Sequence, residues 1–470
     1  MSEVTTVDPA TGQPLATYPG ADVAGVLEVL AAVHAAQPAW AGRPVEERAE
    51  LVRGIGAQLR KQAGELAGLM TAEMGKPITE ARAEVEKSAT ACDYYAEQGP
   101  GFLAARPVDT GSDRRAWVAH EPIGVVLAVM PWNFPFWQVL RFAAPTLLAG
   151  NTAILKHSPN VTGCALAVEQ VFRDAGLPDD AFRSIVVAEA DVPEVSRALI
   201  DDDRVAAVSL TGSEGAGAAV ASAAGRAVKK TVLELGGSDP FVVLADADLD
   251  LAVAGAVKSR FLNSGQSCLA AKRFVVHADV AGEFTRRFAA AVADLRVGDP
   301  RDEATAVGPM ARADLRDGLA RQVRESVTAG ATVLTGGAPV DGPGAFFAPT
   351  VLGDVTLDMP VMAEETFGPV AAVVPVGDDD EAVRVANATR YGLGASVWSG
   401  DPEHALAVGR RITSGALFVN AVVASDPRLP FGGTKRSGYG RELGEAGALE
   451  FTNARTYVVG GGVPTGPATE

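Results

Sequence analysis

Apolar residues recur along the chain with two different spacings. Near the amino end, three alanine-rich stretches have apolar residues every three or four positions, which predicts amphipathic helices over residues 23–37, 44–70 and 78–97. From about Ile123 onward, short valine-rich runs alternate with helical patterns. Strands that alternate with helices in this way are typical of parallel sheets with helices on both faces, so the sequence predicts an α/β fold.

The predicted strands form two series. The first covers residues 124–130, 152–156, 184–187, 205–210 and 231–233, and the second covers residues 241–244, 272–277, 371–375, 396–398 and 416–420. A glycine pair, Gly236 and Gly237, interrupts the pattern between them. We therefore expect two α/β units that meet at this pair, and a glycine- and proline-rich end at residues 460–470 that frays.

One uncharged stretch, residues 122–140, is long enough to suggest a membrane helix. Prolines and Asn133 lie within it, and these would break such a helix and leave polar groups in lipid. The stretch is better explained by a buried strand over residues 124–130 that leads into an irregular loop. Residues 1–20 lack the basic and apolar regions of a secretory signal, so we expect a cytoplasmic protein with no membrane partner.

Composition limits the partners and the cofactors. Of the 470 residues, 47% are hydrophobic and 21% are charged, which is the composition of a folded protein rather than a disordered one. A formal charge of −17 disfavours nucleic acids and anionic membranes as partners. Only three cysteines occur and none has C-x-x-C spacing, so we expect neither a disulfide framework nor a metal site.

Cys268 has the least ordinary surroundings of the three cysteines. Cys92 and Cys164 lie within helical patterns, where cysteine packs as a small apolar residue. Cys268 instead follows a small, polar stretch, residues 263–267, which suits an accessible nucleophilic thiolate. A cysteine hydrolase would also need a nearby histidine, but His277 lies within a predicted strand and nothing in the sequence orients it.

Three further features each allow more than one interpretation when they are taken alone. Residues 205–217 have the form strand, glycine-rich turn and helix, which suits phosphate binding, but Val220 replaces the third glycine of G-x-G-x-x-G. Glu234, at the end of an apolar strand, is either a partnered structural acid or a general base. Asn133 is either a hydrogen-bonding loop residue or a donor to an oxyanion.

Taken together, these features resemble the aldehyde dehydrogenase superfamily over nearly the whole chain. The resemblance rests on six motifs in the family's order: Pro131-Trp132-Asn133-Phe134-Pro135, Thr211-Gly212-Ser213 with Gly217, Glu234-Leu235-Gly236-Gly237, Gly265-Gln266-Ser267-Cys268, Glu364-Glu365-Thr366-Phe367-Gly368-Pro369 and Pro430-Phe431-Gly432-Gly433-Thr434-Lys435-Arg436-Ser437-Gly438. Within the superfamily, residues 134–141, 156–160 and 435–442 look like those of the shorter bacterial succinate-semialdehyde dehydrogenases. The resemblance implies a Rossmann-type cofactor domain, an α/β catalytic domain and a small β oligomerisation element.

The resemblance also implies an activity, the NAD(P)-dependent oxidation of an aldehyde such as succinate semialdehyde to a carboxylic acid. Cys268 would attack the aldehyde carbon, and the Asn133 amide and the Cys268 backbone N–H would hold the oxyanion. Glu234 would activate the water that hydrolyses the resulting thioester. No metal is implied. A dehydrogenase for other aldehydes, a CoA-acylating enzyme and a catalytically silent homologue are the alternatives.

For the cofactor, the resemblance implies a binding site formed by Trp132, Lys156, Ser158, Pro159, Thr211, Gly212, Ser213, Gly217, Leu235, Glu365 and Phe367. Many NAD-using members of the family have a glutamate three residues after the lysine that corresponds to Lys156, where this chain has Pro159. Without that acid, no like charge repels a 2′-phosphate. We therefore expect NADP, or both NADP and NAD, as the cofactor.

For the substrate, the resemblance implies a tunnel that includes Trp137 and Arg141. Because the protein is strongly acidic, a dicarboxylic semialdehyde needs a local cation for its distal carboxylate, and arginine can bind a carboxylate through two hydrogen bonds. Arg141 is the first candidate, its alternative being an ion pair with a surface acid, and Arg428 and Lys435 are second candidates. Ala270 stands where some relatives carry another cysteine, so we expect no local redox switch.

The resemblance divides the chain into three parts. Residues 1–101 and 123–235 would form the cofactor-binding domain and residues 236–451 the catalytic domain. Residues 102–122 and 452–470 would form the oligomerisation element and tail. Members of the family use the C-terminal strand to pair subunits, so we expect a homodimer or homotetramer.

Overall fold

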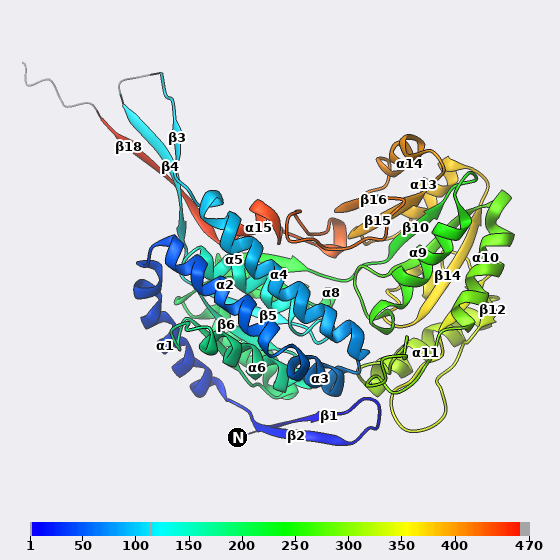
Figure 1. The fold of residues 1–470 in the computed structure, drawn as a ribbon, viewed down its shortest axis with the longest axis horizontal. Coiled ribbons are helices and arrows are strands. Elements are labelled where there is room, and N and C mark those ends of the chain that lie inside the picture. Colours follow the sequence, from blue (N-terminus) through cyan, green and yellow to red (C-terminus); the bar gives the residue numbers. More distant parts are fainter. Residues whose placement is uncertain (1, 112–113, 461–470) are drawn as a thin grey trace, which may run out of the picture.

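The computed structural model describes residues 2–111 and 114–460. Two large sheets lie side by side, each covered by helices, and a narrow antiparallel sheet extends away from the first of them (Figure 1). The α/β class predicted from the sequence is confirmed. The predicted fraying of the carboxyl end stays a prediction, because residues 461–470 lie outside the described part of the chain.

The first sheet has the strand order β17-β9-β8-β5-β6-β7. It consists of parallel β5 (Val125–Met130), β6 (Thr152–His157), β7 (Phe182–Ile185), β8 (Val205–Thr211) and β9 (Lys230–Glu234), with the short β17 (Gly438–Tyr439) antiparallel at one edge. Valine-rich runs form these strands because helices bury both faces of the sheet. The carboxyl ends of parallel strands meet at one edge, where α/β proteins bind ligands.

Two groups of helices enclose this sheet. One group is α1 (Val23–Ala41), α7 (Val192–Asp201) and α8 (Glu214–Arg226). The other is α2 (Val45–Lys61), α3 (Ala63–Met74), α4 (Ile78–Phe102), α5 (Trp137–Leu148) and α6 (Thr162–Asp174). By length and composition alone, α1 could cross a membrane. Its apolar stripe, which includes Val26, Leu30 and Val33, is instead buried in the core shared with the sheet.

The second sheet has the order β12-β13-β14-β11-β10-β15-β16. Its strands are β10 (Asp239–Val243), β11 (Ala271–His277), β12 (Thr332–Thr335), β13 (Thr350–Gly353), β14 (Val370–Val376), β15 (Gly394–Trp398) and β16 (Ala416–Val419). All neighbours are parallel except β12 and β13. The covering helices are α9 (Leu249–Phe261), α10 (Ala278–Ala293), α11 (Ala313–Thr328), α12 (Pro360–Ala363), α13 (Asp379–Asn387) and α14 (Pro402–Gly409).

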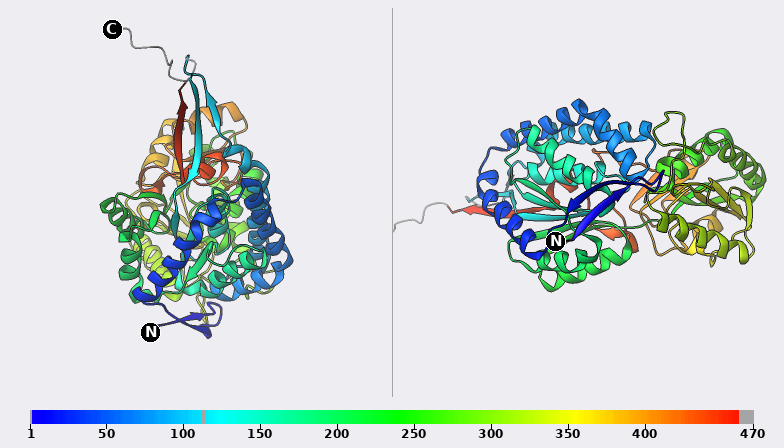
Figure 2. Two further views of the ribbon diagram at one scale, coloured as in Figure 1. Left: turned by 90° about the vertical axis from the view of Figure 1, so that its left-hand side faces the viewer. Right: turned by 90° about the horizontal axis from the view of Figure 1, so that it is seen from below.

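The narrow sheet consists of β3 (Arg106–Val108), β4 (Arg115–Pro122) and β18 (Thr452–Val459). β4 and β18 come from the two segments expected to form the oligomerisation element, residues 102–122 and 452–470, and they pair with each other within one chain. Trp117 on β4 stacks on Tyr457 of β18 with ring centroids 4.9 Å apart. A second small element, the hairpin of β1 (Glu3–Val7) and β2 (Pro14–Pro19), lies at the opposite end of the molecule (Figure 2).

Several elements differ from the sequence prediction. The helix expected over residues 44–70 is two helices, α2 and α3, because Gln62 leaves the helical conformation and binds the Asp174 carboxylate at 3.0 Å. The strand expected at residues 184–187 begins two residues earlier, as β7. The hairpin of β1 and β2 and the pair β12 and β13 were not predicted, because these short strands are largely exposed or lack a valine-rich run.

The chain returns to the first sheet near its carboxyl end. β17 pairs with β9, and α15 (Gly444–Glu450) packs against α4 and α5. The sequence analysis placed these residues with the second unit, because nothing in a two-residue strand indicates its partner. At Gly438, φ is +112° and an added Cβ would lie 1.9 Å from the Leu233 carbonyl oxygen. Only glycine allows this close pairing with β9.

Candidate active site

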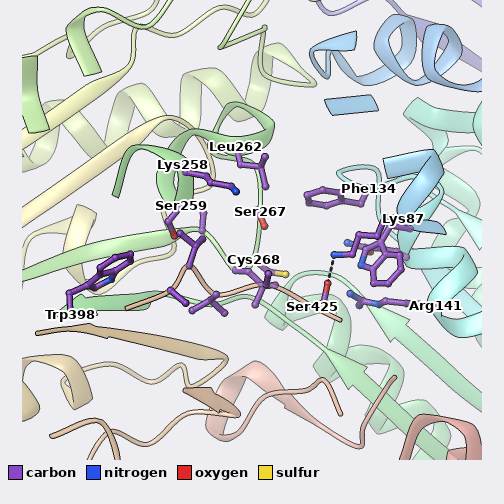
Figure 3. Close-up of a pocket in the computed structure, with 18 residues that line it drawn as sticks. Lys87, Phe134, Arg141, Lys258, Ser259, Leu262, Ser267, Cys268, Trp398 and Ser425 are labelled. Carbon is purple, nitrogen blue, oxygen red and sulfur yellow. Dashed lines mark hydrogen bonds between the residues drawn. The ribbon is translucent and has the colours of Figure 1, made fainter. Parts of the chain in front are cut away.

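Cys268 lies where two cavities meet. The larger cavity, of about 440 Å³, includes Lys87, Phe134, Trp137, Arg141, Trp398 and Ser425 in its wall (Figure 3). The smaller cavity, of about 240 Å³, includes Trp132, Asn133, Thr211, Gly212, Glu365 and Phe367. Cys268 and Gln138 line both. A group bound in one cavity can therefore react with a group bound in the other through this cysteine.

The loop before Cys268 is held in a fixed, unusual conformation. Asn263 and Ser264 have positive φ angles of 55° and 53°, which non-glycine residues rarely adopt. The Glu80 carboxylate of α4 accepts a hydrogen bond from the Asn263 backbone N–H at 2.7 Å. Beyond the loop, the buried Lys272 ammonium donates to the Cys268 carbonyl oxygen at 2.9 Å. Strain of this kind persists where surrounding contacts impose it, and it clusters at functional sites.

The Cys268 thiol is protonated at neutral pH. Burial raises its pKa to about 11, although the charges of Arg141 and Lys272 act in the opposite direction. A thiolate is the reactive form, so a base must remove this proton during attack on a carbonyl. Cys92 and Cys164 are fully buried within α4 and α6, as the sequence predicted.

The Asn133 amide is oriented by two neighbours. It follows β5, and its Nδ2 donates to the Gln266 carbonyl oxygen at 3.1 Å. Its Oδ1 accepts a hydrogen bond from Gln138 Nε2 at 2.9 Å. Gln138 therefore turns the Asn133 N–H donors toward the Cys268 loop, where an oxyanion donor is needed. Gln138 was not among the residues predicted for the site, because the resemblance over residues 134–141 gave roles only to Trp137 and Arg141.

Glu234 is a buried carboxylate whose charge acts on the Cys268 thiol. Within the described part of the chain, neither of its oxygens has a hydrogen-bond partner. Burial and the nearby Glu442 hold its pKa well above the usual range for a glutamate, against the charges of Arg141 and Arg441. A carboxylate with a raised pKa is a stronger base near neutral pH. Glu234 does not line either cavity; a Cβ added at Gly432 would lie 2.8 Å from its Oε1.

The smaller cavity suits a nicotinamide ring and its ribose. Trp132 and Phe367 form aromatic walls, with their rings edge to face and their centroids 5.6 Å apart. The Glu365 carboxylate is held by the Gly237 backbone N–H at 2.9 Å and can accept hydrogen bonds from ribose hydroxyls. Gly217 has a structural role, because a Cβ there would lie 2.5 Å from the Leu235 side chain.

The adjoining turn combines features that suit a pyrophosphate. Thr211 ends β8, Gly212 and Ser213 follow, and α8 begins at Glu214. The Ser213 hydroxyl caps α8 by accepting from the Ala216 N–H at 3.3 Å. The first N–H groups of a helix attract anions. Together with the aromatic walls, this turn shows that the residues present fit a dinucleotide.

Lys156, Ser158 and Pro159 lie at the carboxyl end of β6, at the same edge of the sheet but in the wall of neither cavity. Lys156 is 7% exposed, and burial lowers its pKa while the charge of Glu189 raises it. The Ser158 hydroxyl donates to Asn160 at 2.7 Å. Their assignment to the adenosine side of the cofactor stays a prediction.

The expected substrate residues separate into two groups. Trp137 and Arg141 line the larger cavity. Arg428 and Lys435 have exposed side chains and lie outside its wall; Arg428 pairs with Asp426 at 2.6 Å. Neither side chain thus lines the larger cavity, and their role in binding the substrate stays a prediction. Their positions in the C-terminal motif region gave no sign of where their side chains would point.

Arg141 has an acidic partner inside the protein. Its guanidinium forms an ion pair with Glu442, and the two side chains are 3% and 5% exposed. It also donates to the Thr211 hydroxyl at 3.2 Å and lies over the Phe431 ring, 4.9 Å from its centroid. The alternative considered for Arg141, an ion pair with an acid, is therefore present, although this acid is buried rather than on the surface.

The geometry does not support a role for Cys268 as the nucleophile of a hydrolase. His277 ends β11, lies outside both cavity walls and is 3.7 Å from Asp279. Among the described residues, no histidine lines either cavity. A cysteine hydrolase needs an imidazole beside the nucleophile.

The family model described as "Aldehyde dehydrogenase family" matches residues 1–457, and the chain belongs to this family. A cysteine between two cavities, an oriented amide, a buried acid and a dinucleotide-shaped cavity are compatible with such an enzyme, and the roles of Cys268, Asn133 and Glu234 stay predictions. It is therefore an enzyme that oxidises aldehydes with a nicotinamide cofactor, NAD or NADP. The resemblance seen in the six sequence motifs is confirmed.

Among its relatives are succinate-semialdehyde dehydrogenases. The chain is 48% identical over 450 residues to the Escherichia coli enzyme "Succinate semialdehyde dehydrogenase [NAD(P)+] Sad", covering 96% of both chains. It is 46% identical over 463 residues to an NADP-dependent succinate-semialdehyde dehydrogenase of Mycobacterium avium, covering 97% of both chains. The crystal structure of the Streptococcus pyogenes enzyme with NADP+ superposes with a TM-score of 0.93 at 37% identity and covers 97% of this chain and 99% of that one.

Proposed function

We propose that this protein oxidises succinate semialdehyde to succinate, with NADP preferred over NAD. The observation that carries the proposal is the position of Cys268 between a dinucleotide-shaped cavity and a second cavity with cationic side chains in its wall. The relatives named for this substrate, 45–48% identical over nearly the full chain, support it. Glutarate semialdehyde and simple aliphatic aldehydes are the alternative substrates.

In the proposed reaction, Cys268 Sγ forms a bond to the aldehyde carbon and its proton passes to a base. The Asn133 amide and the Cys268 backbone N–H hold the negative oxygen that results. A bound nicotinamide supplies the acceptor for the hydride that leaves this carbon. Glu234 then takes a proton from water, which adds to the thioester carbon; the carbon–sulfur bond breaks and succinate leaves.

Cofactor binding is proposed at the residues inferred from the family motifs. Trp132, Phe367 and Glu365 would hold the nicotinamide riboside, and the turn at Thr211, Gly212 and Ser213 would hold the pyrophosphate. Leu235 and Gly217 would shape the wall behind it, and Lys156, Ser158 and Pro159 would bind the adenosine ribose. With Pro159 in place of an acid, Lys156 can pair with a 2′-phosphate, which favours NADP.

The oligomeric state and the compartment belong to the same proposal. The narrow sheet extends away from the body of the molecule and leaves β18 at one edge, where a strand of a second copy could pair (Figure 1). We expect a homodimer or homotetramer in the cytoplasm.

Initial rates test the proposal. They are measured with NAD and with NADP for succinate semialdehyde, glutarate semialdehyde and butanal, each with and without CoA. We expect kcat/KM for succinate semialdehyde to exceed that for butanal by roughly a hundredfold, because a buried charge-assisted contact contributes about 2–3 kcal/mol. CoA should change nothing. Equal rates with butanal would disprove the substrate, and CoA-dependent turnover would establish the acylating alternative.

A further inference from the structure

Lys87 is a cation of the larger cavity to which the sequence motifs assign no role. It projects from α4, and its ammonium donates a hydrogen bond to the Ser425 hydroxyl at 2.8 Å. The same ammonium lies over the Trp137 ring, 4.2 Å from the centroid. In Figure 3 the Lys87 ammonium and the Ser425 hydroxyl face each other on the side of the cavity where Arg141 also lies, with Cys268 beside them.

The charges of Lys87 and Arg141 are balanced differently. Arg141 forms its buried ion pair with Glu442, so the pair has no net charge. Lys87 has no carboxylate within ion-pair distance among the described residues. The two acids whose charge acts on it are already paired, Glu84 with Lys76 and Asp426 with Arg428. Of these two cations, Lys87 is therefore the one that an anionic ligand would meet with its positive charge unbalanced.

Helix α4 fixes Lys87 relative to Cys268. Glu84, one turn earlier on the same face, accepts hydrogen bonds from the backbone N–H groups of Phe136 and Trp137 at 2.9 and 3.0 Å, at the start of α5. Glu80, one turn earlier again, accepts from Asn263 in the loop before Cys268. Short links therefore join α4 to both walls of the cavity, and the ammonium keeps its place without a partner that would neutralise it.

The surroundings of Lys87 favour an anion. Phe134, Trp137 and Trp398 give the cavity an apolar wall, which strengthens a charge–charge contact by excluding water. Burial lowers the Lys87 pKa to about 8, so most of the ammonium groups remain charged at neutral pH. An ammonium has three N–H donors. With one donated to Ser425 and the aromatic ring of Trp137 beside it, a donor remains for a ligand.

We propose that Lys87 binds the distal carboxylate of the aldehyde substrate and so selects anionic semialdehydes over neutral aldehydes. This assignment rests on the proposed function and adds to it the residue that discriminates. The carboxylate would neutralise an ammonium that is largely shielded from water and that no carboxylate of the described residues balances, unlike the exposed ammonium of Lys258 in the same wall. A neutral aldehyde of similar length would leave that ammonium as it stands, and would gain nothing from it.

The test compares Lys87→Met with a matched control. Lys258 also lines the larger cavity but is exposed, so Lys258→Met removes the same charge where water screens it. For Lys87→Met we expect KM for succinate semialdehyde to rise by about 30- to 100-fold, the loss of one buried charge-assisted contact, with kcat within threefold. KM for butanal should change less than threefold. Lys258→Met should raise KM for succinate semialdehyde much less than Lys87→Met does, because water screens the Lys258 charge. Lys87→Arg should recover part of the loss.

Each contrary result overturns the assignment in a distinct way. A parallel loss with succinate semialdehyde and butanal in Lys87→Met, with the thermal unfolding midpoint unchanged, would make Lys87 a positioning residue for Trp137. A larger effect of Lys258→Met would move the carboxylate site to the cavity mouth. A preference for the anionic substrate that survives in Lys87→Met would overturn this assignment alone. A wild-type enzyme without that preference would overturn the proposed function as well.

Discussion

The two cavities that meet at Cys268 are built in different ways. The smaller one is formed by backbone turns and by residues of continuous motifs, such as the turn at Thr211–Ser213 and the pair Glu365 and Phe367. The larger one is formed by side chains from separate elements, including Lys87 of α4 and Ser425 of a late loop. A cofactor that does not change can be held by fixed backbone. A substrate can be selected by single side chains, which leaves the backbone unaltered.

Two of the three cations in the wall of the larger cavity, Arg141 and Lys87, differ in a similar way. Arg141 pairs with Glu442, lies near Glu234 and contacts Thr211, so it stabilises the buried acids of the site. Lys87 binds only a hydroxyl and an aromatic face among the contacts above. Removing Arg141 should therefore damage the machinery for every aldehyde, whereas removing Lys87 should affect anionic aldehydes alone.

The largest effect is expected for Glu234→Gln, which belongs to neither cavity wall. The amide cannot take a proton from water, so steady-state turnover should fall by roughly 10²- to 10⁴-fold. Attack by Cys268 should survive, and mixing enzyme with cofactor and aldehyde should produce a burst of reduced cofactor. Stopped-flow absorbance measures this burst. A lost burst would place Glu234 in the step that forms the thioester.

Arg141→Ala should come next, because it leaves Glu442 buried without its cation. We expect a loss of about 3–5 kcal/mol in the free energy of unfolding. Burial raises the pKa of Glu442 and Arg141 opposes this shift, so without Arg141 the folded protein should keep the Glu442 proton to higher pH than the unfolded chain does. The free energy of unfolding of the variant should then fall as pH rises above the ordinary pKa range of a glutamate.

Denaturant unfolding measures the free energy of unfolding of Arg141→Ala between pH 5 and 8, in steps of about one unit. This range lies above the reference pKa of a glutamate. The double variant Arg141→Ala/Glu442→Gln is the matched control, since it removes both charges and should recover part of the stability. Activity should drop for succinate semialdehyde and butanal together. A loss confined to succinate semialdehyde would show that Arg141, like Lys87, acts on the carboxylate.

A smaller effect is expected for Gln138→Met, which keeps the size of the side chain and removes its hydrogen bond to Asn133. The Asn133 amide would then be free to turn away from the oxyanion. We expect kcat to fall by about tenfold for all aldehydes, a fraction of what a complete loss of one oxyanion donor costs. KM should stay within threefold. An unchanged kcat would show that the Cys268 loop alone orients Asn133.

The smallest effect concerns the acidity of Cys268. Iodoacetamide should modify it slowly at neutral pH and about tenfold faster for each pH unit, because alkylation requires the thiolate and burial raises its pKa to about 11. Arg141→Ala should move this profile to still higher pH, since the Arg141 charge lowers the pKa. Lys87→Met should move it less. Mass spectrometry of the modified peptide follows the reaction, and the reverse order would contradict the charge balance described above.

The buried parallel strands were predictable because burial on both faces leaves valine-rich runs in the sequence, as in β5 and β8. Cys268, Glu234 and Asn133 could be proposed as site residues because motifs accompany them, and their catalytic roles stay predictions. The Arg141–Glu442 pair and the Lys87–Ser425 contact were not, since each joins residues about 300 positions apart that only tertiary packing brings together. One signal for Lys87 was available: it lies on the same helix face as Glu80 and Glu84, where a core-facing helix would have apolar residues.

The late return of the chain to the first sheet affects when the site is completed during synthesis of the protein. Gly438 and Tyr439 complete the sheet beside Glu234, and Glu442 neutralises Arg141. During synthesis, all the residues that line the two cavities leave the ribosome before these few do. Early domains fold as they emerge, so a nascent chain would hold Arg141 without its acidic partner until its last segment docks. Competence to react is thus delayed until nearly the whole polypeptide has been made.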